Sequence, residues 1–361
     1  MRGDKSAGVA HQPHCEGRKR SAHLFTAGNF VAYHERDAAH PRKDEQKGST
    51  LRVFTADEVH AGLGYDRLVP ALREAFRHND VEKPLRNVHQ VASGDTPAHL
   101  LTMPAWREGD MIGVKLVTVF PGNSARGLSA VSSVYGLFSG ETGQPLAIID
   151  GEALTNRRTA AASALASTYL SREDAGVLLV VGTGNLARHL AEAHAAMRPI
   201  SRVLVWGRNA DRAEAMSAQL RGKGLNAERV GDLSAATAGA DIVTCATTSR
   251  QPLVKGADLR PGAHVDLVGA FTPQMRETDD AAVLRASVFV DTYAGAFAEA
   301  GDLLQAVTGG GWSTDRTRAD LHELAAGLKP GRQSADEITL FKSVGTALED
   351  LAAAKLLLAA S

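Results

Sequence analysis

Four basic residues stand out as candidates to bind an anion, since each must pair with a negative group or reach water. Lys115 interrupts the apolar run 114–120, and a lysine in such a strand must pair, face a polar cleft or extend to solvent. Arg157 and Arg158 begin an alanine-rich predicted helix, where neighbouring side chains point about 100° apart, so that one of them can face a given site. Arg86 precedes the predicted strands. Together these cations are suited to hold a small carboxylate, although each alone is also compatible with a solvated surface residue.

A glycine turn in the middle of the chain predicts a second kind of chemistry. Val177–Val181 is a continuous apolar run, typical of a strand buried in a parallel sheet. The next six residues match G-x-G-x-x-A, in which the glycines allow a tight turn and a close approach to a pyrophosphate. The free N–H groups of the following helix attract phosphate. We therefore expect a dinucleotide site formed by Gly182, Thr183, Gly184, Asn185, Leu186 and Ala187.

The end of the next predicted strand, near Trp206, indicates which dinucleotide is bound. An NAD enzyme usually has an acidic residue there, about 20 residues past the first glycine, to hold the ribose hydroxyls. Here the strand is followed by Arg208, with Arg212 a turn later. Arginine is suited to a 2′-phosphate, so we expect NADPH, with NADH possible. The alternative is that both arginines are solvated residues at the start of the next helix.

The elements that must position these residues fall into two groups. Four predicted strands joined by short turns indicate an antiparallel or mixed sheet, and from Val177 onward strands alternate with helices, as in a doubly wound parallel sheet. The four strands are His99–Met103, Ile112–Phe120, Val131–Ser139 and Pro145–Asp150. We predict an α/β protein in which a Rossmann domain (171–319) follows a discontinuous α+β substrate-binding domain (51–170 and 320–361).

The C-terminal part of that discontinuous domain is predicted to be a helix. Ser334–Glu337 matches a capping box, which marks a helix start. Apolar residues then recur at helical spacing, and we expect this helix to cross back onto the N-terminal domain. The residues expected on its apolar face are Ile338, Phe341, Val344, Leu348 and Leu351.

Composition restricts the partners and the compartment. The 361 residues carry a formal net charge of -1, which gives no electrostatic case for nucleic acid. No apolar run approaches the roughly 18 residues of a membrane span, and Cys15 and Cys245 cannot form a disulfide framework, so we expect a reducing cytoplasm. We interpret the histidine-rich residues 1–50 as a disordered extension or an over-assigned start, and their histidine spacings match no compact metal site.

Five segments give the chain a clear resemblance to the ornithine cyclodeaminase/mu-crystallin family, over roughly residues 51–358. They are Lys115–Asn123 (KLVTVFPGN), Ala153–Leu165 (ALTNRRTAAASAL), Gly182–Ala187 (GTGNLA), Val268–Glu277 (VGAFTPQMRE) and Asp336–Asp350 (DEITLFKSVGTALED). The resemblance implies a substrate and dimerisation domain built from both chain ends, a Rossmann domain and a homodimer.

The resemblance also assigns roles to residues. In the family an arginine before the first strands, a strand lysine and the arginine of an RTAA motif hold the substrate carboxylate. By position these resemble Arg86, Lys115 and Arg158, so the resemblance selects Arg158 over Arg157. Further cofactor contacts are expected from Thr159, Thr247 and Val268.

Two departures from the family pattern bear on the activity. Ornithine cyclodeaminases have an aspartate after the glycine pair of a VGGD-x-P segment, and here Phe271 stands in its place. A glutamate that deaminases carry just before a Met-Pro pair is matched by Leu101. Phenylalanine neither accepts a proton nor pairs with an ammonium group, so ornithine cyclisation is disfavoured.

The family branch with the VGAFTP segment instead implies reduction of a cyclic imine. We expect NADPH-dependent reduction of Δ1-pyrroline-2-carboxylate to L-proline, with Δ1-piperideine-2-carboxylate, giving L-pipecolate, as a second substrate. Lys115 and Thr272 are the expected catalytic residues, and Phe271 is expected to pack against the substrate ring. The alternatives are ornithine cyclodeamination with bound NAD, an alanine-dehydrogenase-like amination, and a mu-crystallin-like protein that binds NADPH without turnover.

Overall fold

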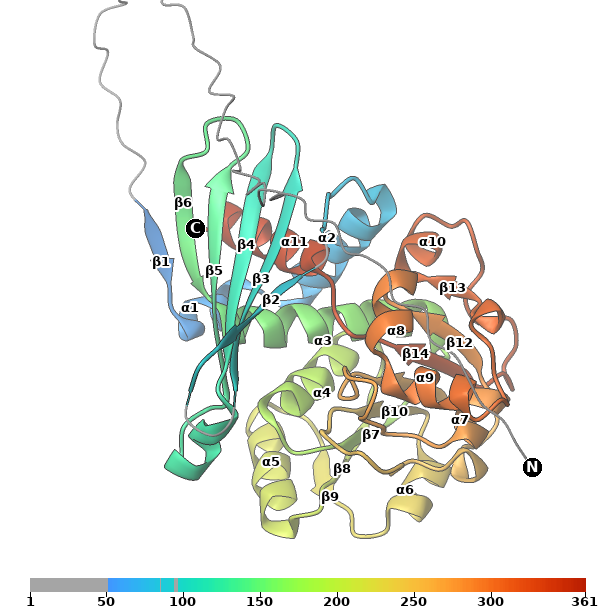
Figure 1. The fold of residues 1–361 in the computed structure, drawn as a ribbon. Coiled ribbons are helices and arrows are strands. Elements are labelled where there is room, and N and C mark those ends of the chain that lie inside the picture. Colours follow the sequence, from blue (N-terminus) through green and yellow to red (C-terminus); the bar gives the residue numbers. More distant parts are fainter. Residues whose placement is uncertain (1–50, 85, 94–96) are drawn as a thin grey trace, which may run out of the picture. The chain divides into compact units, whose positions relative to one another are not determined.

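The described part of the chain forms two β-sheets, one of six strands and one of eight (Figure 1). The structure is a computed structural model that describes residues 51–84, 86–93 and 97–361, so the expectation for residues 1–50 lies outside it. The helices are α1 (Ala56–Gly62), α2 (Tyr65–His78), α3 (Gly151–Leu170), α4 (Asn185–Met197), α5 (Ala210–Gly222), α6 (Leu233–Gly239), α7 (Asp280–Arg285), α8 (Tyr293–Glu299), α9 (Gly301–Thr308), α10 (Leu321–Ala325) and α11 (Ala347–Ala359). None of the described helices combines the length and the apolar character needed to cross a membrane.

The first sheet is mixed, as predicted, and has the order β1-β6-β5-β4-β3-β2. Its strands are β1 (Arg52–Phe54), β2 (Asn87–Val91), β3 (Ala98–Arg107), β4 (Met111–Val119), β5 (Val131–Ser139) and β6 (Pro145–Asp150). Only β1 runs parallel to its neighbour, and the other pairs are antiparallel. In this register Lys115 lies opposite Met103 on one side and Tyr135 on the other. Directly paired residues share a face, so Lys115 and Tyr135 project to the same side of the sheet.

The second sheet is parallel throughout and has the order β13-β12-β14-β11-β10-β7-β8-β9. Its strands are β7 (Val177–Val181), β8 (Arg202–Trp206), β9 (Ala227–Arg229), β10 (Ile242–Cys245), β11 (His264–Leu267), β12 (Ser287–Val290), β13 (Ala319–Asp320) and β14 (Thr339–Lys342). The order reverses between β7 and β10, which defines a topological switch point at the carboxyl ends of the strands. This is the predicted doubly wound α/β fold.

The prediction of a helix beginning at Ser334 is wrong. The local capping bond is present, since the Glu337 backbone N–H donates to the Ser334 hydroxyl at 3.2 Å, but no helix follows. Residues 339–342 instead form β14, which is buried at all four positions and pairs with β11 and β12. Burial between two strands overrides a local helix signal, and a helix begins only at Ala347. We keep the two predicted domains as a proposal, with β14 transferred to the Rossmann sheet.

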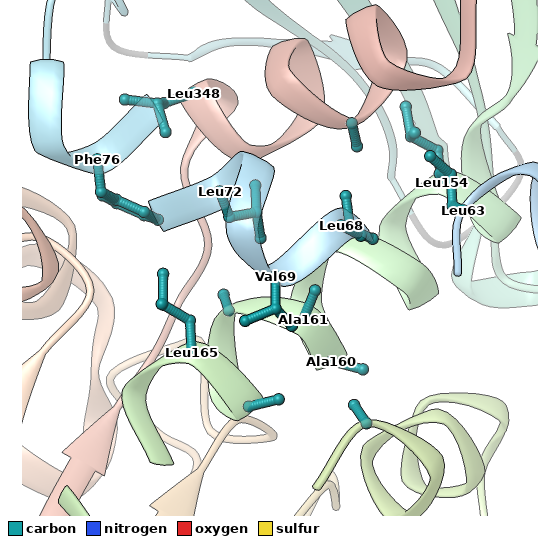
Figure 2. Close-up of a cluster of buried hydrophobic side chains, with 14 of the residues drawn as sticks. Leu63, Leu68, Val69, Leu72, Phe76, Leu154, Ala160, Ala161, Leu165 and Leu348 are labelled. Atoms are coloured by element: carbon teal, nitrogen blue, oxygen red, sulfur yellow. The ribbon is translucent and has the colours of Figure 1, made fainter. Parts of the chain in front are cut away.

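Helix α3 lies at the centre of the core that joins these parts. It contacts α2, α4 and α11, together with strands β5, β6, β11 and β14. Figure 2 shows how Leu68, Leu72 and Phe76 of α2 meet alanines and Leu165 of α3, with Leu348 of α11 beside them. Helix α11 therefore crosses back onto the N-terminal elements, as expected, even though it starts later than predicted. The small residues of α3 allow this close approach, and Arg157 and Arg158 lie about two turns into the helix rather than at its start as expected, because α3 begins at Gly151.

Candidate active site

The turn after β7 has the geometry that a bound phosphate needs. Gly182 has φ +125°, and a Cβ there would lie 2.5 Å from the Ala246 carbonyl oxygen, so the position requires glycine. A Cβ on Gly184 would meet nothing within 4 Å, which leaves open space in front of the turn. Gly184 is the N-cap residue of α4. Because it has no side chain, the first N–H groups of the helix receive no side-chain cap. The turn therefore presents free donors to an open cavity.

A cavity of about 530 Å³ opens at this turn, at the carboxyl ends of β7, β8 and β10. Six of the predicted cofactor residues line it, namely Gly182, Thr183, Gly184, Arg208, Arg212 and Thr247. Asn185 lines an adjoining cavity of about 270 Å³. Leu186, Ala187, Thr159 and Val268 line neither cavity. Further wall residues that the sequence did not single out are Trp206, Gly207, Asn209, Ala246, Thr248, Ser249 and Leu253.

The wall of this cavity at Thr247 is fixed by one buried carboxylate. Glu277 is fully buried, and its Oε1 accepts bonds from the Thr247 backbone N–H at 2.7 Å and the Thr247 hydroxyl at 2.9 Å. Its Oε2 accepts the N–H groups of Gly269 at 2.7 Å and Ala270 at 3.3 Å. One side chain thus ties the loop after β10 to the loop after β11, which leads into Phe271.

The predicted cations Lys115 and Arg158 are brought together by an acidic residue of α11. Lys115 Nζ lies 3.2 and 3.3 Å from the two carboxylate oxygens of Asp350, and Arg158 Nε donates to Asp350 Oδ1 at 3.0 Å. Arg158 Nη1 donates to Glu349 Oε2 at 2.6 Å. All four side chains are buried, so two cations and two carboxyl groups share a site that excludes bulk water.

Burial changes the proton affinity of this cluster. It lowers the pKa of Lys115 to about 8, because desolvation disfavours the ammonium form, with Asp350 opposing and Arg158 adding to the effect. It raises the pKa of Glu349 to about 8, against the attraction of Arg158. Burial also raises the pKa of the Tyr135 phenol, and among the described residues its hydroxyl has no hydrogen-bond partner. The Lys115 ammonium is therefore charged at neutral pH and close to its titration point.

Each cation keeps a donor for a ligand. An ammonium has three N–H donors, and the Lys115 contacts in the described residues all go to Asp350. Arg158 uses Nε and Nη1 for the acids, and its Nη2 has no hydrogen-bond partner among the described residues. The guanidinium lies against the backbone of Gly345, where φ is +84° and a Cβ would lie 2.5 Å from Nη1. A glycine is thus needed for this arginine to occupy its place.

The neighbouring arginine, Arg157, points elsewhere. Its Nε donates to the Leu63 carbonyl at 2.8 Å, and its guanidinium lies 3.9 Å from the centre of the Tyr65 ring. It therefore connects α3 to the start of α2 and does not join the Lys115 cluster. Of the two neighbouring arginines, Arg158 is therefore the one that shares Asp350 with Lys115.

Arg86, the third predicted cation, lies directly before β2 and has its own partner. Asn87, the first residue of β2, pairs with Thr102, whose neighbour Met103 lies opposite Lys115. Arg86 Nη2 donates to Glu299 at the end of α8 at 2.8 Å, and both side chains are about 30% exposed, at 31% and 28%. The structure shows no contact between Arg86 and Lys115 or Arg158 in the part that it describes.

The two positions where deaminases carry acids hold apolar side chains on elements near the site. Leu101 lies on β3 opposite Val117, so it shares the face of Lys115. Phe271 is 47% exposed in the loop after β11, and Thr272 follows it with its carbonyl accepting the Met275 N–H. Neither Phe271 nor Thr272 contacts the Lys115–Arg158 pair in the described residues.

Asp350 and Glu349 are the site residues that the sequence reasoning missed. They lie 235 and 191 residues from their partners along the chain, so no local pattern connects them. The available signal was an adjacent acidic pair at the start of an otherwise alanine- and leucine-rich helix. Such a pair fits a solvated helix start equally well.

The sequence matches the ornithine cyclodeaminase/mu-crystallin family over residues 51–359, and the chain therefore belongs to this family. A Δ1-pyrroline-2-carboxylate reductase from Colwellia psychrerythraea is 38% identical over 309 residues, which cover 84% of this chain and 97% of that protein.

Solved structures of the family have the same fold. The Thermococcus litoralis Δ1-pyrroline-2-carboxylate reductase in complex with NADH and L-proline matches with a TM-score of 0.81 and 32% identity, over 86% of this chain and 97% of that chain. An archaeal alanine dehydrogenase dimer with bound NAD matches with a TM-score of 0.78 and 31% identity, over 86% and 95%. These findings confirm the family and the fold class predicted from the sequence.

Proposed function

We propose that this protein is an NAD(P)H-dependent reductase of cyclic imino acids that converts Δ1-pyrroline-2-carboxylate to L-proline. The observation that carries the proposal is the buried Lys115–Arg158 pair, in which each cation keeps a free donor for a carboxylate. Relatives with this activity, which the chain matches over 97% of their own length, support it. Phe271 and Leu101 stand where a deaminase has acids, which speaks against ornithine cyclodeamination.

The cavity beside β7 fits a nicotinamide dinucleotide. Its glycine turn leaves room for a pyrophosphate, and Gly184 and the start of α4 would hold the phosphates with backbone N–H groups. When bound, the cofactor supplies the hydride. Thr247, fixed by Glu277, would contact it from the opposite wall, and we keep Asn185 as a further phosphate contact.

We further propose that NADPH is preferred over NADH. Arg208 and Arg212 line the cavity at the end of β8, and no acidic side chain is among the residues that line it. Arginine pairs well with a 2′-phosphate. Arg208→Ala is expected to raise the KM for NADPH at least tenfold and to change the KM for NADH less than twofold. A wild-type KM much lower for NADH would contradict this preference.

The substrate carboxylate would bind to Arg158 Nη2 and an N–H of Lys115, with Arg86 as the third cation once it leaves Glu299. Their burial excludes water, which strengthens the ion pair and orients the ring for hydride transfer. Lys115 Nζ still carries a proton at neutral pH, and its pKa, lowered to about 8, lets it give up that proton more readily than an exposed lysine does. We keep Phe271 as a ring contact and Thr272 as a hydrogen-bond partner of the ring nitrogen, both as proposals.

The deciding experiment measures NADPH oxidation with the five- and six-membered cyclic imino acids side by side, with L-ornithine as control. Turnover of the five-membered ring is expected, with the six-membered ring as a weaker or equal substrate. Ammonia release from ornithine without added cofactor would refute the proposal. Lys115→Ala is expected to abolish most turnover while NADPH affinity stays nearly unchanged, because Lys115 lies outside the cofactor cavity.

We propose that two copies associate through the outer face of the six-stranded sheet. This face carries exposed apolar side chains, among them Val53, Leu116 and Trp106 at 65%, 41% and 36% exposure. An archaeal relative in structure is a dimer. Leu116→Glu is expected to shift the mass measured by light scattering from dimer to monomer, and a wild-type monomer would refute the idea.

We also propose a cytoplasmic location, because Cys245, the cysteine that the structure describes, is free and buried.

A further inference from the structure

The inference concerns Asp350, a fully buried carboxylate on a helix that is otherwise mostly alanine and leucine. A buried carboxylate without partners is strongly disfavoured, so its partners explain its presence. Asp350 Oδ1 accepts from both Lys115 Nζ and Arg158 Nε, and Oδ2 accepts from Lys115 Nζ again. One side chain of α11 therefore holds a cation of β4 and a cation of α3 in a single arrangement.

Asp350 also opposes the effect of burial on the charge of Lys115. Around the ammonium lie Asp350 and Glu349 of α11 and Arg158 of α3, with the Tyr135 phenol of β5 opposite Lys115 in the sheet. Burial and Arg158 lower the pKa of Lys115. Asp350 and Glu349 raise it, and the effect of Asp350 is larger than that of Glu349. Without the carboxylate, a buried ammonium would face the Arg158 guanidinium with little opposing charge.

We propose that Asp350 is a positioning residue for the reduction, which sets the spacing of the Lys115 ammonium and the Arg158 guanidinium and keeps Lys115 protonated inside the sealed site. The proposal rests on the proposed function, since it assumes that these two cations bind the substrate carboxylate. Both carboxylate oxygens of Asp350 face the two cations, so the side chain is placed to position them.

The test compares Asp350→Asn with the wild type in the pH dependence of kcat/KM for the cyclic imino acid. In the wild type kcat/KM is expected to fall above about pH 8, the pKa of Lys115. In D350N this basic limb is expected to move down by at least one pH unit, with a tenfold or larger rise of the substrate KM at pH 8. A residue that only supports the fold would lower kcat/KM at all pH values without moving the limb. An unmoved limb with an unchanged KM overturns the proposal.

Two further variants separate the possible causes. Asp110→Asn is the control. It removes a carboxylate that pairs with Lys355, which lies on the exposed side of α11, so both the basic limb and the substrate KM are expected to stay unchanged. Asp350→Glu keeps the charge but moves it by one methylene, so the limb is expected to stay while the substrate KM rises at least threefold. If D350N does not fold, as judged by circular dichroism and NADPH binding, D350E decides. A D350E variant with wild-type KM then overturns the proposal.

A failure of the proposed function has a different result. A wild-type protein that reduces neither imino acid refutes the reductase, whatever Asp350 does. In that case L-proline binding by calorimetry, in the presence of oxidised cofactor, still tests the positioning role. D350N is expected to weaken this binding tenfold or more at pH 8, and equal affinity overturns the inference.

Discussion

Gly345→Ala tests the placement of Arg158 without touching any charged group. Gly345 has φ +84°, and a Cβ built there would lie 2.5 Å from Nη1, 3.1 Å from Nη2 and 3.2 Å from Cζ of Arg158. Ordinary contact begins near 3.4 Å, so the guanidinium must move by about 0.9 Å. Such a shift is large compared with the tolerance of a hydrogen bond that starts at 2.6 or 3.0 Å.

The expected size of the effect follows from the proposed role of Arg158 as a ligand of the substrate carboxylate. A hydrogen bond to a charged group contributes about 1.5–3 kcal/mol, so loss of one such bond to the substrate lowers kcat/KM by roughly 10- to 150-fold. The substitution also places an alanine in the left-handed backbone conformation of Gly345, which costs about 1–2 kcal/mol of stability. NADPH affinity is expected to stay within twofold of the wild type, because Gly345 does not line the cofactor cavity.

A matched control separates the two effects. Gly224, just after α5, also has φ +84°, but a Cβ there meets nothing within 4 Å. Gly224→Ala therefore carries the same backbone strain without the contact to Arg158. Both variants are expected to lose similar thermal stability, and only G345A is expected to lose kcat/KM for the cyclic imino acid. Equal kcat/KM in the two variants would refute the assignment of Arg158 to substrate binding.

Two more predictions concern buried polar groups. Glu277→Gln replaces one acceptor oxygen by an NH2 group that faces N–H donors. We therefore expect the variant to lose about 1–3 kcal/mol of stability and, through the loosened Thr247, to bind NADPH more weakly. An unchanged NADPH affinity in a fluorescence titration would contradict this. Burial lowers the pKa of His264 to about 3, so the unfolded chain alone takes up this proton as the pH falls below 6.5. His264 alone then contributes a loss of about 2 kcal/mol of stability between pH 8 and pH 5, while the lowered pKa of His189 acts in the same direction and the raised pKa values of Glu277 and Glu349 act against it. In urea unfolding, the stability of His264→Gln at pH 5 relative to pH 8 is expected to be about 2 kcal/mol more favourable than that of the wild type, and an unchanged difference would contradict the role of His264.

Most of the fold was predictable because its signals are local. The run Val177–Val181, the glycine turn after it and the alternation that follows place a parallel sheet, and the structure confirms them. The failure at residues 334–346 has a physical cause. Ile338, Phe341 and Val344 recur at helical spacing, but residues 339–342 are inserted between β11 and β12, and this non-local pairing decides their conformation.

The candidate site was only half predictable, since its cations carry a local signal and its acids do not. Lys115 is conspicuous because a charge interrupts an apolar strand, whereas Asp350 occupies a helix start, where acids are common on the surface. Yet two buried cations that lie close together require a negative counter-charge. In the described residues, neither β4 nor α3 provides an acidic partner to Lys115 or Arg158. An acid from a third element was therefore implied by Lys115 and Arg158 themselves. The same requirement explains why the C-terminal helix crosses back: without α11, Lys115 and Arg158 would be two buried positive charges that have no acidic partner among their contacts in the described residues.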